Sequence, residues 1–311
     1  MDFSNLDLSK NQDLAREIVL RGVLEKFEDR REFEKFRNGI VKENKGVIFH
    51  NLYLIKAYND LIEEGKIAEN LDFVRLIQKR GVRTQSGVAP VTVLTKPWPC
   101  PGGCVYCPTD ERMPKSYLAS QPAAQRAFRQ RFNPYTQVFV RLKALQMTGH
   151  EISKVELRII GGTWSVYSRR YQTWFVGQCL LAMNEFGVQV KKCGDKMENV
   201  TRHSKLKSSY GVDEVNTVIV KPLGARGSFS DVVRVNETAD VRCIGINVET
   251  RPDQVNEDEV RRLRKLGVTK VEMGVQTTFD SVQKLTRRGH TMENVRGATL
   301  LLKDAGFKIG Y

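Results

Sequence analysis

The distribution of apolar and polar positions divides the chain into two parts. Between Gln12 and about Arg80, apolar residues recur at spacings of three, four and seven, and charged residues occupy the positions between them. This periodicity predicts amphipathic helices. The polar, glycine-bearing stretch from Arg83 to Gly87 then interrupts the pattern and indicates a boundary. We therefore predict a small helical domain over residues 1–85.

A different pattern begins at residue 86, where short apolar runs alternate with helical segments. The runs that predict strands are Val88–Thr95, Lys154–Ile160, Val241–Val248, Thr269–Val275 and Phe307–Ile309. The helical segments between them include Pro134–Met147, Arg169–Phe186, Glu257–Leu266 and Met292–Ala305. Repeated β-α units imply parallel strands in a wound sheet or barrel, so the predicted fold class is α/β. Residues 187–227 show little periodicity, and we expect an insertion carrying loops there.

The composition is typical of a soluble globular protein. Of the 311 residues 41% are hydrophobic, which is enough to bury a core, and 24 Gly and 10 Pro do not indicate a collagen-like or low-complexity chain. The sequence contains no run of about 18 apolar residues that would predict a membrane span. Its amino-terminal segment also lacks the apolar region of a secretory signal. We therefore expect a cytoplasmic protein with no membrane partner.

The net charge of +14 is concentrated in the second part of the chain. Residues 1–90 carry 16 basic and 15 acidic groups, whereas residues 91–311 carry 34 and 21. A positive field of this kind attracts polyanions and favours a nucleic-acid partner. The alternative is an ordinary basic protein that binds no nucleic acid.

Three of the six cysteines form a group. Cys100, Cys104 and Cys107 lie within eight residues, after the first predicted strand, in the sequence PCPGGCVYCP. Prolines stiffen this loop and the Gly pair lets it bend tightly, so the three thiols can converge. The remaining cysteines are scattered among apolar neighbours and are interpreted as buried thiols without an assigned role: Cys179, Cys193 and Cys243.

The number of grouped cysteines discriminates between kinds of metal site. A structural zinc site takes four protein ligands, and a ferredoxin-type cluster also takes four cysteines, whereas three cysteines on a four-iron cluster leave one iron open. Zinc completed by a remote histidine, in a non-catalytic RNA-binding module, is the alternative. The chain has four histidines, and none of them stands in a metal-ligand spacing with another His or Cys. They are His50, His150, His203 and His290.

The spacing C-x3-C-x2-C, with Tyr106 just before the last cysteine, resembles the loop of the radical S-adenosylmethionine (SAM) superfamily. The resemblance implies that Cys100, Cys104 and Cys107 hold a [4Fe–4S] cluster. The open iron would bind SAM, whose one-electron reduction yields a 5′-deoxyadenosyl radical. The segment Gly161-Gly162-Thr163, directly after a predicted strand, resembles the glycine-rich element that contacts the cofactor in this superfamily.

Further stretches resemble one family within this superfamily, the Elongator catalytic subunit and the single-chain tRNA carboxymethyluridine synthases. The resemblance spans about residues 83–311. Its ordered stretches are Ser86–Val88, Cys104–Pro108, Gln125–Ala127, Arg131–Pro134, Gly149–Glu156, Gly161–Thr163, Asn236–Thr238, Gly245–Asp253, Glu272–Gln276 and Arg288–Thr291. The eukaryotic members differ in having a longer gap between the first two cysteines and a Gly-Gly after the last, where this chain has Thr109-Asp110.

The resemblance implies a fold and a reaction. The fold is a partial TIM-type (β/α)6 barrel over residues 86–311, preceded by the helical domain, which is a candidate tRNA contact. The reaction uses acetyl-CoA to form 5-carboxymethyluridine at the tRNA wobble position and requires an electron donor. Lys154 matches a family lysine associated with acetyl-CoA. Glu249, Arg251 and Gln276, at strand ends, are candidate cofactor or substrate contacts, although a buried Glu–Arg pair is a structural alternative.

The excess of basic residues suggests how tRNA would be attracted. Basic residues interleaved with aromatic ones follow the cysteine loop, and we expect the basic ones to be exposed and to contact phosphates: Arg126, Arg129, Arg131, Arg141 and Lys143. The interleaved aromatic residues are expected in the core: Phe128, Phe132, Tyr135 and Phe139.

Two expectations concern what the chain lacks. We count five strands, where the superfamily's partial barrel usually has six, so the barrel is expected to be truncated at its end. The acetyltransferase domain that follows in family members is missing, which indicates a fragment or a protein completed by another polypeptide. Another radical SAM enzyme, such as a methylthiotransferase or a porphyrinogen oxidase relative, is the alternative function.

Overall fold

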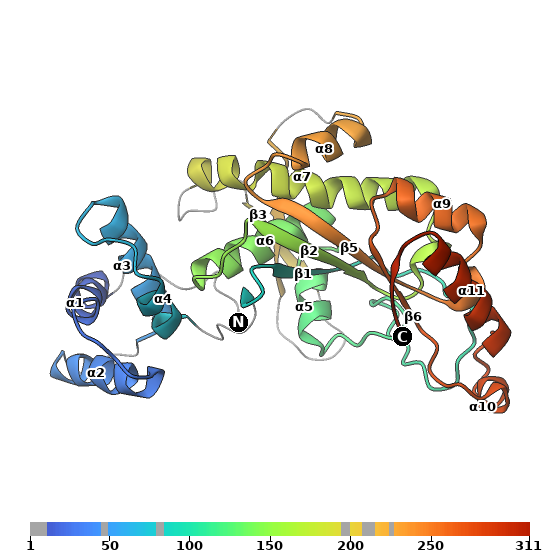
Figure 1. The fold of residues 1–311 in the computed structure, drawn as a ribbon, viewed down its shortest axis with the longest axis horizontal. Helices are drawn as coiled ribbons and strands as arrows, with labels where there is room; N and C mark the ends of the chain where they lie inside the picture. The colour runs from blue at the N-terminus through green and yellow to red at the C-terminus, as the bar shows by residue number, and fades with distance from the viewer. Residues whose placement is uncertain (1–10, 45–48, 79–83, 194–199, 207–214, 224–226) are drawn as a thin grey trace. The chain divides into compact units, whose positions relative to one another are not determined.

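The computed structural model describes residues 11–44, 49–78, 84–193, 200–206, 215–223 and 227–311 (Figure 1). The chain divides into two compact units. The first comprises Met1–Ala89 with Lys143–Ile152, and the second Pro90–Leu142 with Ser153–Tyr311. The first unit thus includes a ten-residue segment that the sequence pattern assigned to the second. No helix in the described ranges is long and apolar enough to cross a membrane.

The described residues before residue 79 form helices, as the periodicity predicted for this region. They are α1 (Gln12–Gly22), α2 (Arg30–Glu43), α3 (Asn51–Glu63) and α4 (Leu71–Ile77). The apolar positions Ile18, Val19 and Leu61 are fully buried and form their common core together with Phe33, whose ring meets that of Phe73 edge to face. Burying these side chains stabilises helices that would be marginal in isolation.

The second unit is built on a five-stranded sheet whose strands are the five predicted ones, with ends that differ by a few residues. In spatial order they are β1 (Ala89–Leu94), β2 (Lys154–Ile160), β5 (Arg242–Thr250), β6 (Lys270–Met273) and β7 (Lys308–Gly310). The pairs β2/β5, β5/β6 and β6/β7 are parallel. The predicted α/β class is therefore confirmed, and the carboxyl ends of these strands lie at one edge of the sheet.

Helices connect the strands of this sheet. They are α5 (Pro122–Arg129), α6 (Pro134–Met147), α7 (Arg169–Cys193), α8 (Phe229–Asn236), α9 (Glu257–Lys265), α10 (Asp280–Leu285) and α11 (Met292–Asp304), with 3-10 turns η2 at Trp164–Val166 and η3 at Pro252–Gln254. Asn133 and Asn256 cap α6 and α9, because their side-chain oxygens accept hydrogen bonds from the backbone N–H groups of Thr136 and Glu259.

The predicted insertion over residues 187–227 contains more regular structure than the pattern indicated. Helix α7, which lies along β5 in Figure 1, continues seven residues past its predicted end at Phe186. Gln189 stabilises this extension because it is fully buried and donates hydrogen bonds to Tyr135 Oη and the Lys221 carbonyl. β3 (Val200–Leu206) and β4 (Val215–Val220) form a separate antiparallel pair. Residues 194–199, 207–214 and 224–226 lie outside the described ranges.

Buried apolar residues alternate with partly exposed residues along β2 and β6, so the sheet has one apolar and one polar face. Val155, Leu157 and Ile159 of β2 are buried, and so are Val271 and Met273 of β6. The residues between them are only partly covered and include the charged set Glu156, Arg158, Lys270 and Glu272. Because successive side chains of a strand point to opposite faces, charged groups collect on one face of the sheet.

The turn that follows β2 requires glycine. Gly161 has φ +130° and Gly162 has φ +95°, in the region that residues with a side chain rarely adopt. Thr95 crosses closely over this turn, since its N–H donates to the Ile160 carbonyl at 3.0 Å and its Oγ1 to the Gly161 carbonyl at 3.1 Å. A Cβ on Gly161 would overlap Thr95 Oγ1 and lie 3.0 Å from the Thr95 nitrogen.

Gly161→Ala is therefore expected to lower the free energy of unfolding by roughly 2 kcal/mol, because it adds backbone strain and a steric overlap. Gly297→Ala is the matched control. Gly297 lies on the exposed side of α11 with open space around it, so alanine there should raise stability by roughly 0.5–1 kcal/mol. Chemical denaturation of the two variants measures both effects. Equal stability of the two variants would contradict the account of the turn.

Candidate active site

A cavity of about 710 Å³ lies at the carboxyl ends of β5, β6 and β7. The cysteine loop and the turn after β2 complete its wall. Eight residues that the sequence singled out line it: Cys100, Cys104, Cys107, Gly162, Thr163, Glu249, Arg251 and Gln276. Segments separated by more than a hundred residues in the sequence thus meet at one place, because parallel strands bring their carboxyl ends to the same edge.

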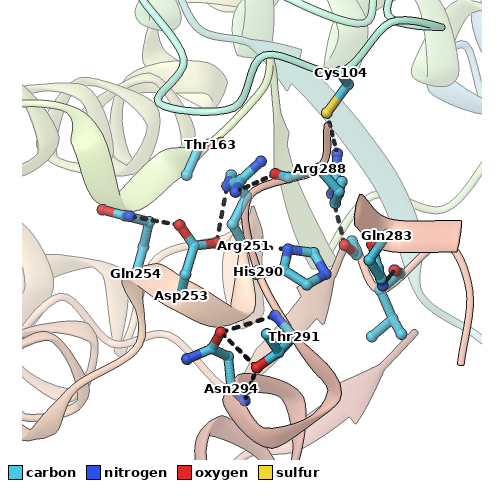
Figure 2. Close-up of polar contacts among 12 residues, drawn as sticks. Cys104, Thr163, Arg251, Asp253, Gln254, Gln283, Arg288, His290, Thr291 and Asn294 are labelled. Carbon is cyan, nitrogen blue, oxygen red and sulfur yellow. Dashed lines mark hydrogen bonds and ion pairs between the residues drawn. The ribbon is translucent and has the colours of Figure 1, made fainter. Parts of the chain in front are cut away.

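Each of the three cysteine thiols has a polar neighbour. Cys100 Sγ lies 3.5 Å from Thr163 Oγ1, and Cys107 Sγ lies 3.4 Å from Ser116 Oγ. Cys104 Sγ accepts a hydrogen bond of 3.3 Å from Arg288 Nη1 (Figure 2). All three thiols are partly exposed. The loop therefore presents its sulfurs to the cavity from positions that neighbouring segments help to fix.

The donor set bears on the kind of metal group that the loop could hold. In the described part of the chain, no three His, Cys, Asp or Glu side chains are grouped as ligands of a metal ion. In a four-iron cluster each cysteine binds a different iron. Three thiols that line one wall of a large cavity, with the guanidinium of Arg251 buried nearby, suit an anionic cluster with three protein-held corners and space in front of the fourth.

Arg251 is the most deeply buried charged group of this wall, with its side chain 4% exposed. Its Nε donates to Asp253 Oδ1 at 2.9 Å and its Nη2 to the Arg288 carbonyl at 2.7 Å (Figure 2). Its Nη1 has no hydrogen-bond partner among the described residues. This nitrogen packs against Gly102, where any Cβ would overlap it. Arg251 therefore supports the cysteine loop, and its Nη1 keeps its N–H groups unsatisfied.

The alternative to a binding role was that Glu249 and Arg251 form a buried ion pair. They do not pair with each other. Arg251 pairs with Asp253, whereas Glu249 Oε2 accepts a hydrogen bond of 2.8 Å from Tyr117 Oη. Burial raises the pKa of Glu249, and the Tyr117 hydrogen bond opposes this shift. Burial also raises the pKa of Tyr117, and the charge of Glu249 adds to the effect. The cavity thus contains a carboxyl group that keeps its proton to a higher pH than an exposed glutamate.

The pKa of a second carboxyl group in the cavity, that of Glu272, is shifted in the opposite direction. Burial alone would raise the pKa of Glu272, but hydrogen bonds from Lys270 Nζ at 2.8 Å and Asn247 Nδ2 at 2.7 Å lower it below its usual range. Arg158 adds a salt bridge at 3.2 Å. The pKa values of two carboxyl groups on adjacent strands therefore shift in opposite directions, because Glu272 has cationic partners and Glu249 has a phenol.

Several residues of this site were missed in the sequence. Lys270 and Glu272 line the cavity, and their alternation with the buried Val271 and Met273 was a usable signal for a polar strand face. Tyr117 and Arg288 also line it. They come from a long loop and from a turn between helices, where no periodicity indicates which way a side chain points.

Other predicted residues lie away from the cavity. Gly161 packs against Thr95 and does not line the wall. Lys154 is exposed at the amino end of β2, the opposite end from the cysteine loop. The predicted tRNA-contacting residues also lie outside the cavity wall: Arg126, Arg129, Arg131, Arg141 and Lys143.

The prediction that these basic residues are exposed is wrong for four of the five. Arg131 is exposed, whereas the others are half-buried: Arg126, Arg129, Arg141 and Lys143. For Arg141 and Lys143 the physical reason is the burial of the helix that carries them, α6. Residues 134–139 at the start of α6 are all buried, so basic residues farther along this helix are partly covered as well. Of the aromatic residues expected in the core, Tyr135 and Phe139 are buried there, whereas Phe128 and Phe132 are only partly buried and pack against a core cluster.

The histidines that could have completed a zinc site lie in different environments. His150 belongs to the first unit, where its Nδ1 is 3.0 Å from Thr84 Oγ1. His290 is buried behind the cavity with Nδ1 3.6 Å from Asp253 Oδ1 (Figure 2). Burial and the charges of Arg288 and Arg251 lower its pKa. His50 precedes α3, and the side chain of His203 lies outside the described residues.

The raised pKa of Glu249 predicts a pH effect on stability. A carboxyl group whose pKa is raised by folding contributes stability below its unfolded pKa and loses that contribution as pH rises through its folded pKa. Glu249→Gln should therefore stabilise the protein more at pH 8 than at pH 5, in unfolding experiments with denaturant. Glu237→Gln, at an exposed position, should show no such difference. Equal effects of Glu249→Gln at both pH values would contradict the assignment.

Comparisons with known proteins agree with this geometry. The profile of the Radical SAM superfamily matches residues 195–311, a range that begins after the cysteine loop. The tRNA uridine(34) acetyltransferase of Methanocaldococcus infernus is 32% identical over 299 residues, which cover 94% of this chain and 49% of that protein. Elongator complex protein 3 of Danio rerio is 31% identical over 75% of this chain and 38% of its own length. The chain thus spans about half the length, or less, of these curated relatives.

A solved structure is also similar, that of archaeal Methanocaldococcus infernus Elp3 with an N-terminal deletion (1–46). Its sequence is 31% identical to this chain. The alignment covers 72% of this chain and 37% of the archaeal chain, with a TM-score of 0.48. The sequence matches confirm the resemblance drawn from the motifs. The chain belongs to the radical SAM superfamily, and its homologues are radical SAM enzymes named tRNA uridine(34) acetyltransferase and Elongator complex protein 3.

Proposed function

We propose that this chain is the radical SAM part of an enzyme that converts the wobble uridine of tRNA to 5-carboxymethyluridine with acetyl-CoA as the carbon source. One observation carries the proposal. Three cysteines, a glycine turn and the ends of β5 and β6 line a single cavity, in a chain whose relatives are named for acetyl transfer to tRNA uridine 34. We further propose that it acts in the cytoplasm with a one-electron donor as partner.

In this proposal Cys100, Cys104 and Cys107 hold a [4Fe–4S] cluster, which when reduced supplies the electron that cleaves bound SAM. The family implies both groups. Gly162 and Thr163 are proposed to contact SAM, with Gly161 shaping the turn that places them in the wall. Glu249, Arg251 and Gln276 are proposed as cofactor or substrate contacts. The position of Gly162 in the cavity wall supports its contact with SAM, because a residue without a side chain lets the backbone approach a ligand closely.

The carboxyl groups of Glu249 and Glu272 would orient a substrate through different hydrogen bonds. Glu249, protonated to a higher pH than usual, can donate a hydrogen bond as well as accept one. Glu272, held ionised by Lys270, can only accept. A uracil ring offers an N–H donor and two carbonyl acceptors, so such a pair can recognise it. This supports a splayed-out base in the cavity.

The tRNA contacts are proposed to be Arg126, Arg129, Arg131, Arg141 and Lys143, with the helical unit as a further contact. The excess of basic groups in residues 91–311 supports electrostatic attraction of phosphates. For acetyl-CoA, Lys154 is the proposed contact. It is exposed and pairs in register with the exposed Arg242, so two cations lie side by side where phosphate groups could bind.

The proposed reaction can be tested by anaerobic incubation of the reconstituted protein with SAM, dithionite, acetyl-CoA and unmodified tRNA. Mass spectrometry should detect 5′-deoxyadenosine, and 5-carboxymethyluridine in the digested tRNA. Cys104→Ala should abolish both products, because it removes one cluster ligand. A methylthiolated nucleoside instead would favour the alternative radical enzyme. SAM cleavage that does not respond to tRNA or acetyl-CoA would contradict the proposed substrates.

Lys154→Ala tests the acetyl-CoA contact. Loss of a cation beside the phosphates should raise the KM for acetyl-CoA several-fold and leave iron content unchanged, since Lys154 lies far from the cysteine loop along β2. Lys308→Ala is the matched control, because Lys308 is an exposed lysine at the amino end of β7 in the same sheet. An unchanged KM in Lys154→Ala, or a loss of iron, would refute the assigned role.

A further inference from the structure

Arg288 joins the cysteine loop to the end of a strand. It lies in the turn between α10 and α11, and its guanidinium makes two hydrogen bonds in different directions (Figure 2). Nη1 donates to Cys104 Sγ at 3.3 Å, and Nη2 donates to the Gly274 carbonyl at 2.6 Å, just beyond β6. Its Nε is buried without a hydrogen-bond partner among the described residues. Cys104 thus accepts a hydrogen bond from a permanent cation, whereas the side-chain groups beside the sulfurs of Cys100 and Cys107 are hydroxyl groups.

The surroundings hold Arg288 in this position. Its N–H donates to the Gln283 carbonyl at 2.9 Å, and its carbonyl accepts a hydrogen bond from Arg251 at 2.7 Å. Gln283 is itself buried and donates to the Val275 and Thr277 carbonyls. A Cβ on Gly274 would lie 2.6 Å from Arg288 Nη2, so glycine there leaves room for the guanidinium. The orientation of Arg288 is therefore set before any cluster binds.

The cysteine loop is tied to the same turn through its backbone. The N–H of Val105 donates to the Thr286 carbonyl at 3.1 Å. Cys104, its neighbour in sequence, is thus held by a side-chain bond from Arg288 and by a backbone bond one residue later. A change in the position of this turn would move one cluster ligand relative to the other two.

The charge of Arg288 has a consequence for redox chemistry. Hydrogen bonds to ligand sulfurs and nearby charge set the potential of an iron–sulfur cluster. Reduction adds one electron to the cluster, so the reduced form is more negative and gains more from a neighbouring cation than the oxidised form does. A guanidinium cannot be deprotonated in a protein, so this effect is permanent.

We propose that Arg288 is a positioning residue that fixes Cys104 and raises the midpoint potential of the [4Fe–4S] cluster, so that an external one-electron donor can reduce it. This role of Arg288 rests on the proposed cluster site and does not depend on tRNA or acetyl-CoA as substrates. Arg251 has a different role, because its free nitrogen faces Gly102 and not a sulfur.

The test compares Arg288→Gln, which removes the charge, with Arg288→Lys, which keeps it. Arg287→Gln is the matched control, because Arg287 is the exposed neighbour and loses the same charge. Iron and sulfide are quantified after anaerobic reconstitution. The oxidised cluster is then titrated with dithionite in the presence of redox mediators, and formation of the reduced cluster is followed by electron paramagnetic resonance.

We expect Arg288→Gln to bind wild-type iron but to be reduced only at a more negative potential, with Arg288→Lys closer to the wild type and Arg287→Gln unchanged. Loss of iron in Arg288→Gln with retention in Arg288→Lys also supports a role for the charge. An unchanged potential in Arg288→Gln, or loss of iron in both variants, would overturn the proposal. A wild-type protein that binds no iron would instead refute the cluster site itself.

Discussion

The parallel register of β2, β5 and β6 is the constraint on which the site depends. Ile159 pairs with Val248, and Thr250 pairs with Met273. This register brings the turn at Gly161–Thr163 and the ends of β5 and β6 to the same edge of the sheet, although they are far apart in sequence. The cysteine loop, which follows β1, lies at this edge too, because the Thr95 N–H just after β1 donates to the carbonyl of Ile160 at the end of β2. A slip of one residue would turn the charged face of each strand toward the core.

The site contains several buried or partly buried charged groups, and each of them bonds a polar or charged neighbour. Arg251 is paired with Asp253, Arg288 bonds a sulfur and a carbonyl, and Glu272 bonds Lys270. The free-energy cost of burying such groups can exceed what their pairing returns. Their position around the cavity is therefore weak evidence for a stabilising role, and it agrees with the radical SAM relatives of the chain.

The sequence predicted the parts of the fold that depend on local pattern. All five strands of the sheet could be located, because runs of apolar residues mark strands buried on one face or both. The cysteines and the Gly162–Thr163 turn were found because their spacing carries chemistry. Tyr117 and Arg288 could not be found, since only tertiary packing directs their side chains into the cavity. The half-burial of Arg126 and Arg141 was missed for the same reason.

The central claim is that three cysteines hold a four-iron cluster with one open corner. Mössbauer spectroscopy of the anaerobically reconstituted, iron-57-enriched protein tests it most directly. The account predicts about four iron and four sulfide per chain, and a change in the signal of a single iron when SAM is added. Zinc in place of iron, or a cluster whose four irons do not respond to SAM, would contradict it.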